Sequence, residues 1–131
     1  TDAKGDGRIL EYDCESEART LVATPVSAAT NFYALYQEKV LPNQRNSIYG
    51  HGRERYDAVL DVFRQQEGNY TDDTVWAALR AASQDPEPES VTSNTQWSVA
   101  YNNTDLTSDI VIRRNWKDIT HYDLKENKER R

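Results

Sequence analysis

Two segments with helical spacing lie in the middle of the chain, and strand-like segments flank them on both sides. In residues 53–66, apolar side chains recur at the spacing of one helical face. In residues 71–83, Thr71 can serve as the N-cap, and two aspartates in the first turn favour the helix dipole. A chain with central helices between two groups of strands is typical of an α+β fold.

The strand predictions come from short runs of alternating or β-branched residues. They cover residues 8–12, 19–23 and 26–31 before the helices, and 96–101, 107–113 and 119–124 after them. Residues 32–47 contain Pro42 and two asparagines and are predicted to be mostly loop. Trp76 and Trp97 fall on apolar stripes, so we expect both in the core.

Composition excludes several classes of protein. The 131 residues amount to one domain or less, and the formal charge of −6 argues against a surface that follows nucleic-acid phosphates. No apolar run is long enough for a membrane span. Cys14 is the single cysteine, so no intrachain disulfide can form. The compartment is otherwise unknown from the sequence, and this cysteine usage slightly favours the cytoplasm. We expect residues 1–124 to form the folded part and 125–131 a charged tail.

Asn31 is the first candidate for chemistry, because it is the last residue of a predicted strand. An asparagine there can direct its side-chain NH₂ into a cleft and stabilise an oxyanion. The alternative is a turn residue that hydrogen-bonds its own backbone. Composition alone favours the turn.

Arg55 is the second candidate, with Arg53 as its rival at the start of the predicted helix 53–66. A guanidinium offers several fixed donors for a carboxylate or for orienting a thiolate. Positive charge is unfavourable at a helix N-terminus, so its presence needs another reason. A surface salt bridge is the alternative interpretation.

Three short motifs carry a family resemblance: AATNFY at 28–33, GHGRERYDAVL at 50–60 and NTQWSVAY at 94–101. In their order and spacing they resemble the second half of choloylglycine-hydrolase-like linear amide C–N hydrolases, which are N-terminal-nucleophile (Ntn) enzymes. The resemblance covers residues 1–124. It implies that this chain is the C-terminal portion of an αββα sandwich.

The same resemblance implies an activity and assigns residues to it. Members cleave linear amides such as bile-salt conjugates and penicillin V, or transfer the acyl group, through an N-terminal cysteine whose α-amine is the base. Asn31 and Arg55 match active-site positions of the family. The first half, which carries the cysteine, is not in this chain, so the chain alone is expected to be inactive. We expect a partner that supplies that half, or self-association.

Several other residues were weighed for the site. Tyr33 and His51 are candidate substrate contacts near Asn31, although a glycine-flanked histidine is also an ordinary loop residue. The acidic surroundings of Cys14 disfavour a thiolate nucleophile. Thr1 resembles an internal family position rather than a nucleophile. His51 and His121 have no closely spaced ligand partners, so no metal or other cofactor is predicted.

Two other functions remain open. The first is a non-catalytic α+β module that binds another protein, in which Asn31 is a turn residue and Arg55 a surface charge. The second is a self-sufficient hydrolase that uses Thr1 as its nucleophile. An enzyme portion must bring Asn31 and Arg55 together, whereas an interaction module need not.

Overall fold

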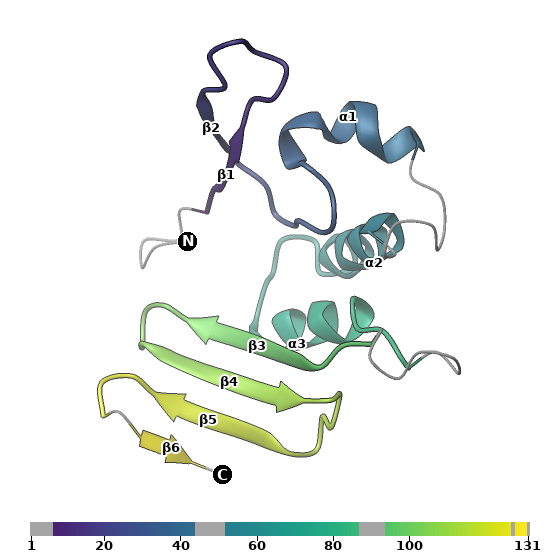
Figure 1. Cartoon of the computed structure of the whole chain (residues 1–131). Helices are drawn as coiled ribbons and strands as arrows, with labels where there is room; N and C mark the ends of the chain where they lie inside the picture. Colours follow the sequence, from purple (N-terminus) through teal and green to yellow (C-terminus); the bar gives the residue numbers. More distant parts are fainter. Residues whose placement is uncertain (1–6, 44–51, 87–93, 127, 131) are drawn as a thin grey trace. The chain divides into compact units, whose positions relative to one another are not determined.

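The computed structural model describes residues 7–43, 52–86, 94–126 and the backbone of 128–130. The fold class is α+β, as predicted (Figure 1). The chain divides into two compact units, Thr1–Leu60 (unit 1) and Asp61–Arg131 (unit 2). Each unit is described by itself.

Unit 1 combines a two-stranded hairpin with short helical segments. Its elements are β1 (Ile9–Tyr12), β2 (Leu21–Thr24), η1 (Ala34–Tyr36), α1 (Gln37–Val40), η2 (Leu41–Asn43) and the greater part of α2 (Gly52–Gln65). The strands β1 and β2 are antiparallel, with Ile9 opposite Thr24 and Tyr12 opposite Leu21. The turn η1 contacts both strands, so the hairpin has one covered face.

Two predictions for unit 1 are wrong. Residues 26–31 form no strand, since their polar side chains contact the start of α2 and they have no neighbouring strand with which to pair. Residues 34–43, predicted to be loop, form η1, α1 and η2. The Glu11 side chain on β1 caps the beginning of this helical segment. Its carboxylate accepts hydrogen bonds from the backbone N–H groups of Ala34 and Leu35, both at 2.8 Å. That contact joins residues 23 and 24 positions apart, which local propensity does not reveal.

Unit 2 is a helix packed on an antiparallel meander. Its elements are α3 (Asp72–Ala81), β3 (Trp97–Asn102), β4 (Thr107–Ile112), β5 (Ile119–Asp123) and β6 (Lys128–Arg130). The sheet order is β3-β4-β5-β6, so each strand pairs with its neighbour in sequence (Figure 1). The three predicted strands are confirmed. The segment expected to be a tail also contributes β6.

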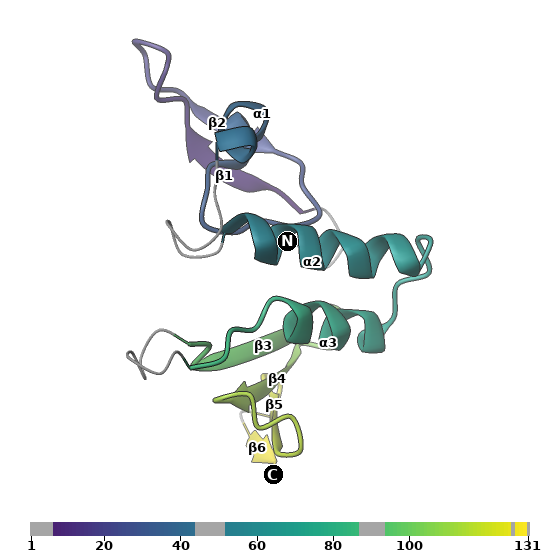
Figure 2. The same cartoon turned by 90° about the vertical axis from the view of Figure 1, so that its right-hand side faces the viewer.

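The capping prediction for α3 is confirmed at Thr71. Thr71 is the N-cap, and its backbone N–H donates to the Thr74 hydroxyl at 3.1 Å. The helix lies along one face of the sheet (Figure 2). That face contains Ser98 and Val111, which are directly opposite each other on β3 and β4 and are buried. Val111 has no exposed surface, so it forms the centre of the unit 2 core.

The prediction that Trp97 is a core residue is wrong. Side chains alternate along β3 as predicted, but α3 covers the face that carries small residues such as Ser98. Trp97 lies on the other face and is 65% exposed, as are its register partner Ile112 at 55% and Tyr101 at 71%. Small residues permit close approach of a helix to a sheet, so side-chain size did not indicate the buried face.

Trp76, by contrast, is half-buried on α3. Its ring meets that of Trp116 edge-on, with centroids 6.3 Å apart. The guanidinium of Arg80 lies over the Trp116 ring, 5.4 Å from the ring centroid. These contacts fix the orientation of Trp76 on the sheet side of α3.

Candidate functional site

Three consecutive residues of unit 1 contact the first two turns of α2. The Thr30 hydroxyl donates to the carbonyl of Gly52 at 2.5 Å. The Asn31 side-chain oxygen accepts a hydrogen bond from Nη2 of Arg55. The chain segment before the helix is therefore held against it by side chains rather than by a β ladder.

An aromatic contact completes this attachment. Phe32 and Tyr56 meet edge to face, with ring centroids 5.2 Å apart and planes at 76°. The Tyr56 hydroxyl donates to Gln37 at 3.2 Å. Successive residues on one side thus pair with one face of α2, which sets the position of Asn31 relative to Arg55.

Arg53 and Arg55 make different contacts, which distinguishes their roles. Arg53 donates to the backbone carbonyl of Leu41 at 3.1 Å and forms an i,i+4 ion pair with Asp57 at 3.5 Å. Both contacts are structural, and neither involves Asn31. Of the two arginines, Arg55 is the one that contacts the candidate asparagine, which is the pairing that the resemblance implies.

The Arg55 contact determines which end of the Asn31 amide remains available. A guanidinium is a donor only, so the atom facing it must be the side-chain oxygen. The Asn31 NH₂ group makes no hydrogen bond in the described part of the chain. Because Asn31 is exposed, this NH₂ can donate to a bound molecule.

Asn31 lies on the wall of an open groove with a volume of about 500 Å³. The groove is lined by Ile9, Leu10, Glu11, Tyr12, Asn31, Phe32 and Tyr33. Leu10, Tyr12 and Tyr33 are largely exposed, so most of its surface is apolar or aromatic. The Glu11 carboxylate is used in capping η1, which leaves the Asn31 amide and the hydroxyls of Tyr12 and Tyr33 as the polar groups open to a ligand.

A second polar cluster stabilises the tip of the hairpin. The Tyr36 hydroxyl donates to Asp13 at 2.6 Å and accepts the backbone N–H of Glu15 at 3.1 Å. The Tyr36 hydrogen bond, followed by that from the Glu15 N–H, lowers the pKa of Asp13 below its ordinary 3.8. Loss of solvation, followed by the hydrogen bond to Asp13, raises the pKa of Tyr36 above 10.0.

The remaining candidates fall in different places. Tyr33 lines the groove with Asn31, and its role as a substrate contact stays a prediction. His51 and Thr1 lie outside the described residues. Cys14 is exposed on the hairpin, with Sγ 3.5 Å from the carbonyl oxygen of Tyr12.

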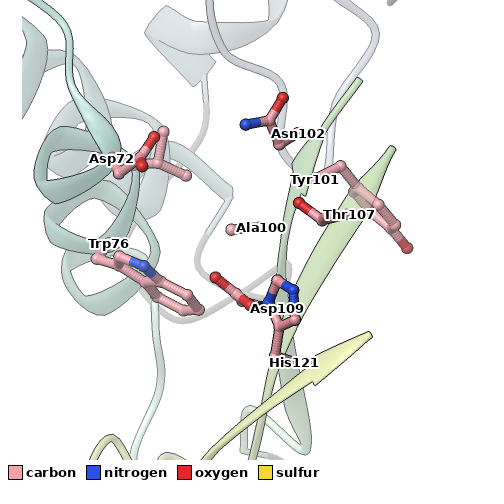
Figure 3. Close-up of a pocket in the computed structure, with 9 residues that line it drawn as sticks. Asp72, Trp76, Ala100, Tyr101, Asn102, Thr107, Asp109 and His121 are labelled. Carbon is pink, nitrogen blue, oxygen red and sulfur yellow. Dashed lines mark hydrogen bonds and ion pairs between the residues drawn. The ribbon is translucent and has the colours of Figure 1, made fainter. Parts of the chain in front are cut away.

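Unit 2 contains a polar pair that the sequence analysis missed. Nδ1 of His121 lies 2.6 Å from Oδ1 of Asp109, and the two residues are directly opposite in the β4–β5 ladder. They face Asp72 and Trp76 of α3 across a pocket (Figure 3). The signal was present, because a hairpin centred on residue 115 pairs positions 109 and 121. Short spacing along the sequence does not reveal such cross-strand partners, which here are 12 positions apart.

The described residues contain neither a metal-ligand group nor a membrane-spanning helix. Within residues 7–43, 52–86 and 94–126, no three metal-ligating side chains are grouped so that they could hold an ion. No helix in the same residues is sufficiently long and apolar for a transmembrane span.

Comparison with protein-family models, with curated proteins and with solved structures found no match to this chain.

Proposed function

We propose that this chain is the C-terminal portion of a cysteine Ntn hydrolase that cleaves linear amide C–N bonds or transfers their acyl group. The hydrogen bond between Asn31 and Arg55 beside the groove carries the proposal. These are the two residues that the choloylglycine-hydrolase resemblance assigns to the active site, 24 positions apart in sequence.

Asn31 would act on the substrate carbonyl. When a nucleophile attacks an amide, the carbonyl oxygen becomes an oxyanion, and a donor placed for it contributes about 10²–10³ in rate. The Asn31 NH₂ supplies such a donor while its oxygen is held by Arg55. Asn31 is therefore assigned to oxyanion stabilisation.

Arg55 would position this donor. By holding the side-chain oxygen it selects one of the two orientations of the amide. Its positive charge beside Asn31 also favours negative charge on a bound oxygen. Arg55 is thus a positioning residue with an electrostatic contribution.

The groove favours a class of acyl group. Exposed Leu10, Tyr12 and Tyr33 provide apolar and aromatic surface next to Asn31. Such surface suits N-acyl amides with apolar or aromatic acyl groups, including the bile-salt and penicillin V types that the resemblance implies. The nucleophilic cysteine would come from the other half of the enzyme, so this chain alone should not turn over such substrates.

The test uses phenoxyacetamide, a small linear amide with an aromatic acyl group. In an NMR titration of the isotopically labelled chain, we expect shifts of the Asn31 NH₂ and of groove backbone amides, with no hydrolysis. Asn31→Asp keeps the oxygen that faces Arg55 but removes the donor, so binding should weaken about tenfold. Arg53→Lys is the matched control and should leave the affinity unchanged.

Equal affinities of the parent chain and Asn31→Asp would contradict the role of Asn31. Shifts confined to residues away from the groove would contradict binding of the amide in the groove. Hydrolysis by the chain alone would contradict the proposal that the nucleophile comes from the other half of the enzyme.

A second candidate, the protein-interaction module, is favoured by a sheet face of unit 2 that no helix of the described residues covers. Trp97, Val99, Tyr101, Ile110 and Ile112 alternate onto this face. The absence of charge among these β3 and β4 side chains makes the face compatible with a second copy of itself, and two-fold association is the commonest mode of self-assembly. On this view, a second copy of the chain covers the face.

Sedimentation velocity over a concentration series tests this candidate. Trp97→Ser should abolish self-association, whereas Tyr12→Ser should not, although Tyr12 is similarly exposed at 62% against 65%. A parent chain that stays monomeric at high concentration would exclude the homodimer and leave the face for a different partner.

A further inference from the structure

We propose that the pocket between α3 and the sheet of unit 2 binds a small organic cation, namely a primary amine or a guanidinium compound. This inference is independent of the amide hydrolase proposal, since all its residues belong to unit 2. The pocket has a volume of about 220 Å³ and is lined by Asp72, Val75, Trp76, Ala100, Tyr101, Asn102, Thr107, Asp109 and His121.

The Asp109–His121 pair presents acceptors to this pocket. An ionised carboxylate accepts only, so Nδ1 of His121 donates to Asp109, and Nε2 is an acceptor when the imidazole is in its neutral form. Nε2 of His121 and the second oxygen of Asp109 make no hydrogen bond in the described part of the chain. Two unused acceptors therefore lie on the sheet side of the pocket.

Asp72 provides another acceptor on the helix side (Figure 3). Its carboxylate has no ion pair or side-chain hydrogen bond among the described residues. No lysine or arginine lines the pocket. Acceptors on facing walls require a ligand that donates in more than one direction, as ammonium and guanidinium groups do.

A metal ion fits this arrangement less well than an organic cation. A point cation needs three or more ligands close together, and the described residues contain no such group. Asp72 lies on α3, whereas Asp109 and His121 are on adjacent strands, so a ligand with some length is needed to reach both walls.

Trp76 contributes an aromatic ring to the pocket lining on the α3 side. The ring stands beside the pocket, below Asp72 and to the left of Asp109 and His121 in Figure 3. Its edge-on contact with Trp116 fixes its orientation. Tryptophan is the side chain whose ring face attracts cations most strongly.

The other polar residues supply few competing donors. The Asn102 oxygen accepts the backbone N–H groups of Thr104 and Asp105, and its amide donates to Asp105. Asn102 is thus committed to its own turn. The Thr107 hydroxyl and the indole N–H of Trp76 remain as donors, and the acceptors outnumber them. The negative charge of the Asp72 and Asp109 carboxylates therefore favours a cation.

The experiment is an NMR titration of the 131-residue chain with n-butylammonium at pH 8, with 1-butanol as the uncharged probe of matched size. We expect n-butylammonium to shift resonances of His121, the Trp76 indole and β4. Asp109→Asn and Asp72→Asn should each weaken binding about tenfold. Asp73→Asn is the matched control: it removes the same charge from the same helical turn, outside the pocket lining, and should change the affinity by less than twofold.

Three results would overturn the proposal. Equal binding of 1-butanol would show that charge is not recognised. Full affinity in both Asp109→Asn and Asp72→Asn would remove the pocket carboxylates from the site. An equal loss in Asp73→Asn would mean that the ammonium ion responds only to the acidic surface. Amide spectra of the variants verify that each is folded.

Discussion

Different kinds of interaction stabilise the inside of each of the two units of this chain. Unit 1 has a short hairpin, and its remaining segments are attached through side chains, as at Glu11, Thr30 and Asn31. Unit 2 has a four-stranded ladder with a helix on one face and Val111 fully buried beneath it. Unit 1 therefore depends on a few polar contacts between distant positions, whereas unit 2 depends on a regular backbone ladder.

This difference affects how each candidate site is positioned. The Asn31 amide is placed by one hydrogen bond and by the attachment of its neighbours to α2. The Asp109–His121 pair is placed by strand register, which all β4–β5 hydrogen bonds enforce together. Single substitutions should consequently disturb the groove of unit 1 more readily than the ladder of unit 2.

The largest expected effect is in the unit 2 core. Val111→Ala removes two methyl groups from a fully buried position and should lower the free energy of unfolding by about 2 kcal/mol. Hydrogen exchange followed by mass spectrometry should show faster exchange in β3, β4 and β5, with little change in β1 and β2. Equal acceleration in both units would mean that they unfold together and would remove the distinction between them.

A smaller effect is expected at the polar contact that starts η1. Glu11→Ala deletes the acceptor for the Ala34 and Leu35 N–H groups and should cost about 1–2 kcal/mol in local stability. The exchange of amides in residues 34–43 should accelerate, while those of β4 stay protected. Glu17→Ala, at an exposed position of the hairpin turn, is the control and should leave both unchanged.

The smallest effect concerns pH at the hairpin tip. Because Asp13 has a lowered pKa in the folded chain, its contribution is present above its ordinary 3.8 and is lost as pH falls through the lower folded value. Tyr36 has a raised pKa, so its contribution is present below 10.0 and is lost as pH rises through the higher folded value. Tyr36→Phe should raise the pKa of Asp13 toward 3.8, as measured by carbon-detected NMR titration. Tyr33→Phe, which changes no contact of Asp13, should not move it.

Much of unit 2 could be predicted because its signals are local. The Thr71 cap, the helical spacing after it and the turns between strands each lie within a few residues. The buried face was not predictable in the same way. It depends on the close packing of α3 against small residues, so Trp97 was placed on the wrong side.

Unit 1 was harder because its organisation is non-local. Residues 26–31 have strand-like composition, but a strand requires a neighbour, and these residues contact α2 instead. The proximity of Asn31 to Arg55 came from the resemblance, since no spacing rule connects positions 24 apart. The Asp109–His121 pair needed only the hairpin symmetry and could have been found from the predicted strands.

The sequential strand order of unit 2 has a consequence for the way the chain folds. Every neighbouring pair in β3-β4-β5-β6 is joined by a short turn, so each ladder closes a small loop. The contacts that organise unit 1 close loops of 22 to 24 residues, a costlier step for a disordered chain. Chains rich in local contacts fold faster, so unit 2 should acquire its structure first. The groove that contains Asn31 would then be among the last parts of the molecule to form.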